Sequence, residues 1–101
     1  MKSLVKVDSI KGAIEEYGED CELYMVIKLI DMGSFTSKSY KLYRAQVKNV
    51  DNEDINLIWI SYDRENKIAN ECGYTYRWDM YDDLQIEYGN VIGLYVLVDE
   101  G

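Results

Sequence analysis

Catalysis by this 101-residue sequence would have to rely on carboxylates and two cysteines, because it contains no histidine. Histidine is the usual general base at neutral pH and the most common metal ligand, so its absence excludes histidine-dependent triads and typical zinc sites. Cys21 and Cys72 are far apart in the sequence and form no paired-cysteine metal or redox motif. We expect both to be reduced, partly buried thiols.

Nineteen Asp and Glu residues are present, but their spacing marks no pair as a catalytic acid and base. The acidic run at residues 51–54 offers oxygen ligands for calcium, yet it lacks the glycine and the final glutamate of a calcium-binding loop. Gly12 and Gly33 lie in no phosphate-binding motif. We therefore expect a non-catalytic protein without cofactor or metal, which acts by binding another molecule.

The charge balance indicates the kind of molecule that would be bound. Nineteen acidic residues against eleven basic ones give a net charge of −8. This charge disfavours direct binding to nucleic acid or to an anionic membrane, because both require clustered Lys and Arg. A basic protein is the expected partner.

Composition also bears on location. No apolar run is long enough to span a membrane, and the first eight residues hold too short an apolar stretch for a signal peptide. We therefore expect a cytoplasmic protein. The lack of Pro and His, together with abundant Ile, Asn, Lys and Tyr, is typical of AT-rich coding and suggests an AT-rich bacterial host or one of its phages.

Residues 1–101 are expected to form a single domain, because a 48% hydrophobic content in a chain of this length suffices for one core. The helices and strands of this domain must position the acidic groups. Helical spacing between Ser9 and Gly18 predicts a short helix, and the polar residues 63–73 are expected to form a loop. Alternating or continuous apolar residues predict the strands. These are 4–7, 21–31, a strand after a turn at 32–38 with a bulge at Leu42 and Tyr43, a central strand at 55–60, an aromatic strand at 74–78, and 91–98.

Residues 79–88 carry conflicting signals. A capping Asp79, further acids in the first turn and a following Gly89 favour a helix, whereas Leu84, Ile86 and Tyr88 alternate as in a strand. We favour the helix. The order of elements then predicts an α+β domain, with a mainly antiparallel sheet of about five strands and one or two short helices on one face.

Acids beside tyrosines are the candidate partner-binding residues. Ten tyrosines exceed what so small a core can bury, and interfaces favour rigid aromatic rings that also offer a hydrogen bond. For each group taken alone, a solvated surface that maintains solubility is the alternative. The favoured candidates are Asp79, Tyr81, Asp82, Asp83, Glu87 and Tyr88, and the second group is Glu15, Glu16, Glu19 and Asp20.

Two segments carry a resemblance to known proteins: residues 79–88, with the sequence DMYDDLQIEY, and residues 15–20, with the sequence EEYGED. In general character the chain resembles the small acidic inhibitors of phages, in particular the anti-CRISPR proteins that block RNA-guided nucleases. The resemblance implies a stoichiometric inhibitor that occupies the basic nucleic-acid channel or target-recognition site of a CRISPR nuclease and excludes DNA or guide. Its acids would pair with Lys and Arg there, while Tyr81 and Tyr88 supply anchoring area.

Two other hypotheses fit the same composition. One is an immunity or antitoxin-type protein that neutralises a basic toxin nuclease. The other is an accessory domain that forms a homodimer through an exposed sheet edge or an aromatic face. Salt would weaken either inhibitor complex but would have little effect on an apolar homodimer.

Overall fold

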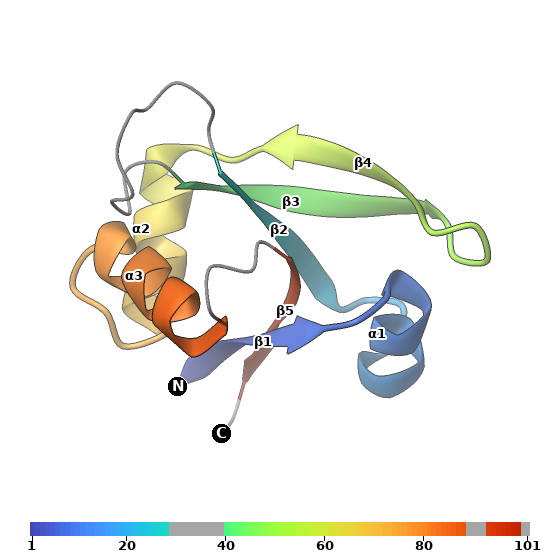
Figure 1. Cartoon of the computed structure of the whole chain (residues 1–101), viewed down its shortest axis with the longest axis horizontal. Coiled ribbons are helices and arrows are strands. Elements are labelled where there is room, and N and C mark those ends of the chain that lie inside the picture. The colour runs from blue at the N-terminus through green and yellow to red at the C-terminus, as the bar shows by residue number, and fades with distance from the viewer. Residues whose placement is uncertain (29–39, 89–92, 100–101) are drawn as a thin grey trace.

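The chain folds around one antiparallel sheet (Figure 1). The computed structural model describes residues 1–28, 40–88 and 93–99. Within them the strands are β1 (Lys2–Val7), β2 (Glu22–Lys28), β3 (Tyr40–Asn49), β4 (Asp54–Trp59) and β5 (Leu94–Asp99), and the helices are α1 (Ile10–Tyr17), α2 (Tyr62–Glu71) and α3 (Arg77–Tyr88). The strand order is β1-β5-β2-β3-β4, and each neighbouring pair is antiparallel. The prediction of an α+β fold with a five-stranded antiparallel sheet is confirmed.

Helices cover both faces of the sheet rather than one. Successive side chains of a strand point to opposite faces, so Leu23 and Tyr24 of β2 belong to two separate apolar clusters. Ile10 of α1 packs in the cluster of Leu23, whereas Ile68 of α2 and Met80 of α3 pack in the cluster of Tyr24. The described helices therefore number three, one on the first face and two on the second, where one or two on a single face were expected.

Helix α1 begins and ends where its sequence predicts. The Ser9 hydroxyl accepts a hydrogen bond from the Gly12 amide at 3.0 Å, which caps the first turn. Gly18 ends the helix with φ 93°, in the region that favours glycine. None of the helices in the part of the chain that the structure describes is long and apolar enough to cross a membrane.

Helix α2 occupies most of the segment that was predicted to be a polar loop. Ser61 caps it, since its hydroxyl accepts a hydrogen bond from the Arg64 amide at 3.2 Å. The buried residues of the helix are Glu65, Ile68 and Ala69. They follow the i, i+3, i+4 spacing of a core-facing helix, but the first of them is charged, and this hides the apolar period.

Residues 74–78 do not form the predicted aromatic strand. The chain turns there, the rings of Tyr76 and Trp78 stack with centroids 4.8 Å apart, and α3 begins at Arg77. The preference for a helix over residues 79–88 is confirmed.

Strand β4 lies at an edge of the sheet, although its apolar sequence predicted a central position. Of the described strands only β3 pairs with it. Its last residues, Ile58 and Trp59, are 37% and 56% exposed. The irregularity in β3 falls between Val47 and Asn49 and not at the predicted position. The expected turn at 32–38 lies outside the described residues.

The capping role of Ser61 can be tested by substitution. We expect Ser61→Ala to lower the free energy of unfolding by about 1 kcal/mol, because one amide of the first turn loses its acceptor. Urea unfolding followed by circular dichroism measures this change. Ser61→Asp should retain wild-type stability, because aspartate caps equally well. Equal stability of Ser61→Ala and wild type would contradict the assignment.

Candidate functional site

The candidate acidic residues lie on two surfaces at opposite ends of the molecule (Figure 1). Helix α1 and the turn between β3 and β4 form one end, and α2 and α3 lie side by side at the other. The structure thus separates the two predicted groups.

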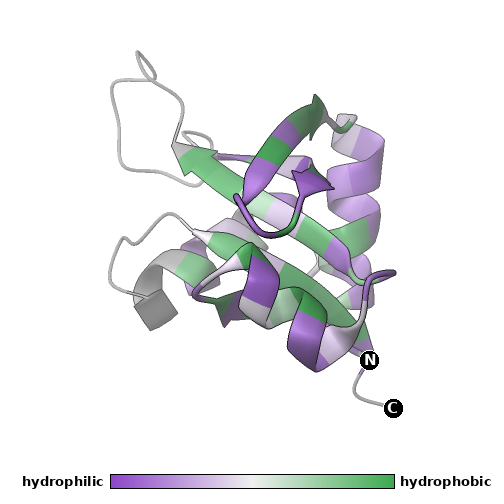
Figure 2. Cartoon of the chain, turned by 90° about the vertical axis from the view of Figure 1, so that its right-hand side faces the viewer, coloured by the Kyte–Doolittle hydropathy of each residue, from purple (hydrophilic) through white to green (hydrophobic). Residues whose placement is uncertain are grey.

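The α1 end carries more acid than the sequence indicated. The Ile10 amide donates a hydrogen bond to Glu53 Oε1 at 3.1 Å, so the turn between β3 and β4 contacts the start of α1. Figure 2 views the molecule from this end and shows the turn, mostly hydrophilic, beside the helix. We call the exposed carboxylates here the α1 acidic surface. It comprises Glu15, Glu16, Glu19, Asp20, Asp51, Glu53 and Asp54.

The α3 acidic surface comprises the exposed residues Asp79, Asp82 and Asp83. Their i, i+3, i+4 spacing places them on one face of the helix. The side chains of Glu87 and Tyr88, predicted to belong to this group, lie outside the described residues.

Tyr81 was expected to anchor a partner, and this expectation is wrong. Its side chain is on the opposite side of α3 from the acids and is only 2% exposed. Its hydroxyl donates a hydrogen bond to Glu65 Oε1 in the core. Tyr81 therefore joins α3 to α2 and offers no surface to a partner.

A buried ion pair lies beneath this end of the molecule. Lys41 Nζ and Glu65 Oε2 are 2.8 Å apart, and each side chain is 1% exposed. Strand β4 pairs with β3 only as far as Trp59, which lies opposite Tyr43. The next amide of β3, that of Leu42, donates a hydrogen bond to Glu65 Oε1 at 3.3 Å instead. Lys41 also donates to the carbonyl of Ile60 at 2.9 Å. Both charges are therefore paired and hydrogen-bonded, as burial requires.

Four aromatic residues form a surface above the ion pair, which we call the aromatic strip: Trp59, Tyr62, Tyr76 and Trp78. They come from the end of β4, the start of α2, and the turn and first residues of α3. Trp59, Tyr62 and Tyr76 are 56%, 57% and 51% exposed, and Trp78 is half-buried. A contiguous group of exposed aromatic rings is typical of an interaction surface.

Two cations link the rings of the strip. Lys41 Nζ lies 4.0 Å from the ring centroid of Trp59 and 4.3 Å from that of Tyr62. Arg77 Cζ lies 4.5 Å from the ring centroid of Tyr62 and 5.4 Å from that of Trp78. The strip is therefore a continuous set of contacts.

Sequence reasoning noted the aromatic residues but did not assign the strip. Trp59 was placed in a central strand, and Tyr76 and Trp78 on the face of a sheet. The available signal was local, because Asp63 directly follows Tyr62 and Asp79 directly follows Trp78. This signal does not distinguish exposed from buried rings, because Tyr81 also lies beside an aspartate and is buried.

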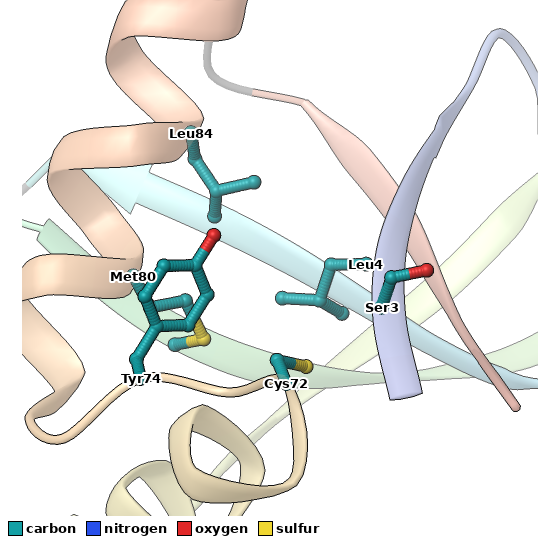
Figure 3. A pocket seen from close by; sticks show the side chains of 6 residues that line it. All are labelled: Ser3, Leu4, Cys72, Tyr74, Met80 and Leu84. Carbon is teal, nitrogen blue, oxygen red and sulfur yellow. The ribbon is translucent and has the colours of Figure 1, made fainter. Parts of the chain in front are cut away.

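A small cavity lies between β1 and the helices α2 and α3 (Figure 3). It has a volume of about 100 Å³ and is lined by Ser3, Leu4, Cys72, Tyr74, Met80 and Leu84. Burial, with a contribution from the nearby Glu71, raises the pKa of the Cys72 thiol to about 11. The thiol is therefore protonated at neutral pH, and a protonated thiol is a poor nucleophile. Burial also raises the pKa of Cys21.

No cluster of potential metal ligands accompanies these surfaces in the described part of the chain. Among those residues, no three Cys, Asp or Glu side chains gather to hold a metal ion. Comparisons with protein-family models, with curated proteins and with solved structures found no match. The surfaces themselves are therefore the basis for inferring what the protein binds.

The buried pair predicts a strong effect of removing one charge. We expect Lys41→Met to lower the free energy of unfolding by about 3–5 kcal/mol, because Glu65 is left buried without its counterion. The double variant Lys41→Met/Glu65→Gln should recover part of this loss, because the neutral amide still accepts from Leu42 and Tyr81. Urea unfolding of both variants provides the measurement. Lys48→Met, at an exposed position of β3, is the control and should stay within about 0.5 kcal/mol of wild type.

The Tyr81 hydroxyl predicts a loss of stability at high pH. Burial and the adjacent Glu65 carboxylate raise its pKa well above the ordinary value. The unfolded chain therefore releases this proton at lower pH than the folded chain, so the stabilisation is complete below about pH 10 and decreases above it. Above about pH 10, we expect the free energy of unfolding of wild type to fall by about 1.4 kcal/mol per pH unit more than that of Tyr81→Phe, which lacks the hydroxyl. Unfolding curves at a series of pH values measure it, and equal pH slopes for the two proteins would refute it.

Proposed function

We propose that this protein is a non-catalytic inhibitor that binds a basic nucleic-acid-binding protein, most specifically an anti-CRISPR protein that blocks DNA or guide access to a CRISPR nuclease. The observation that carries the proposal is the arrangement of exposed carboxylates on two surfaces at opposite ends of a rigid domain. Carboxylates fixed in this way can occupy the positions of phosphates in front of Lys and Arg side chains.

The dimensions of the molecule support this proposal. Its longest dimension is 36 Å, and one turn of duplex DNA rises about 34 Å. The whole domain is therefore about as long as one turn of duplex. A basic channel built for about one turn of duplex could therefore hold the domain, with one acidic end against its Lys and Arg side chains.

The proposal has consequences for location and mechanism. The protein would act in the cytoplasm of an AT-rich bacterial host, with its nuclease, and would be encoded by a phage. It would compete with nucleic acid for one basic site, so one inhibitor would block one nuclease. An immunity protein for a basic toxin nuclease would use the same surfaces and would differ only in the enzyme it inhibits.

A cleavage assay tests the proposal directly. Purified RNA-guided DNA nucleases of several types, and a panel of basic toxin nucleases, are titrated with the protein while substrate cleavage is measured. We expect complete inhibition of one CRISPR nuclease near a one-to-one ratio, and weaker inhibition when salt is raised to about 1 M, where the Debye length is about 3 Å. Inhibition of a toxin nuclease alone would favour the immunity protein. Inhibition of neither class at large excess, or turnover in a hydrolase screen, would overturn the proposal.

Two charge-neutral variants show which end binds. The first carries Glu15→Gln, Glu16→Gln, Glu19→Gln and Asp20→Asn, and the second carries Asp79→Asn, Asp82→Asn and Asp83→Asn. Neutralising the surface that contacts the nuclease should raise the inhibitor concentration needed by about tenfold, equivalent to about 1.4 kcal/mol. The other variant, matched in kind, should show only the smaller effect of the long-range field. Unchanged inhibition by both would exclude the carboxylates as the binding groups.

A further inference from the structure

The aromatic strip is the main exposed apolar feature of the described residues. Among all described residues, the exposed large hydrophobic side chains are Met1, Ile58, Trp59, Tyr62 and Tyr76. Three of these five belong to the strip. Trp and Tyr are the residue types that most often anchor protein interfaces. The acidic surfaces account for the charge of a partner but leave the strip without a role.

The strip is held rigidly before any partner binds. Lys41 contacts the rings of Trp59 and Tyr62, and Lys41 is itself fixed by Glu65 and by the carbonyl of Ile60. Stacking between aromatic rings fixes the far end of the strip. Rings that are already ordered lose little conformational entropy on binding, so more of their contact energy appears as affinity.

A carboxylate accompanies the exposed ring of Tyr76. The Asp79 amide donates to the carbonyl of Tyr76 at 3.2 Å, so this exposed aspartate lies one helical turn from the Tyr76 ring. A ring face beside a carboxylate suits a guanidinium group, which stacks on the ring and makes paired hydrogen bonds to the acid. A lysine ammonium is more strongly hydrated and lacks the planar shape for both contacts.

The cations beneath the strip do not cancel this preference. Lys41 is neutralised by Glu65 at 2.8 Å, and Arg77 Nε lies 4.0 Å from the same carboxylate. Four acids and one base are exposed on α2 and on the described side chains of α3: Asp63, Asp79, Asp82, Asp83 and Lys67. The local field is therefore attractive to a basic group.

We propose that the aromatic strip is the anchor that receives an arginine side chain of the basic partner, which stacks on Tyr76 and pairs with Asp79; the ring of Tyr62 is already contacted by Lys41 and Arg77. This inference deepens the proposed function and rests on it for the identity of the partner. A second copy of the chain fits the strip poorly, because each copy carries a net charge of −8 and would bring its own acids against the same acids.

Fluorescently labelled nona-arginine and nona-lysine peptides, which carry equal charge, test the inference by fluorescence anisotropy at about physiological salt. We expect wild type to bind nona-arginine about fivefold more tightly than nona-lysine, as one cation–π contact would produce. The variant Tyr76→Ala should lose this preference and bind both peptides alike. Tyr76→Phe keeps the ring and should retain it. Absence of the preference in wild type, or its persistence in the alanine variant, would overturn the inference.

Controls separate this inference from the proposed function. The neutralised α1 variant should weaken both peptides equally, because it changes the field and not the strip. If wild type inhibits a nuclease and the folded alanine variant inhibits it equally well, the strip is not the anchor although the proposed function stands. If the arginine preference is lost in the alanine variant but no nuclease is inhibited, arginine anchoring stands and the proposed function fails. A dimer in sedimentation analysis that the alanine variant abolishes would assign the strip to a second copy and overturn the inference.

Discussion

The ion pair between Lys41 and Glu65 fixes the relative positions of the sheet and the two helices on its second face. Removing two charges from water costs several kcal/mol per ion, and this is offset only when every polar atom of the pair finds a partner. Here the carboxylate also binds the Leu42 amide and the Tyr81 hydroxyl. A single carboxylate thus connects β3, α2 and α3, and a shift of any of the three would leave a buried group unpaired.

The same pair also determines the surface above it. Lys41 lies against the rings of Trp59 and Tyr62 while its ammonium is held by Glu65. Apolar residues of equal volume could fill the core as well as a buried pair does, but they would offer no cation to those rings. The network therefore contributes a defined arrangement of exposed aromatic side chains more than it contributes stability.

The elements that could be predicted from the sequence are those that do not depend on this buried network or on other contacts between distant residues. Strand β1 and helix α1 follow from local apolar spacing and from caps at Ser9 and Gly18, which require no knowledge of distant residues. Helix α2 was missed because Glu65 occupies a core position, and a buried carboxylate is recognised only when its partner on β3 is known. The acids at 15–20 and 79–83 were correctly read as exposed, but their separation at opposite ends depends on the sheet order, which no local pattern contains.

The errors over aromatic residues have one physical cause. Tyr and Trp have a large apolar area and a polar group, so each is stable in a core with a hydrogen-bond partner or at a surface beside water. Tyr81 is buried because Glu65 accepts a hydrogen bond from its hydroxyl, and Trp59 is exposed because β4 is an edge strand. The exposed rings and the acids have different ranges of action. Charges attract a partner over about 10 Å and raise the association rate, whereas ring contacts act only after docking and slow dissociation. A partner selected by both would need basic charge over a wide surface and arginine at the point where the strip lies.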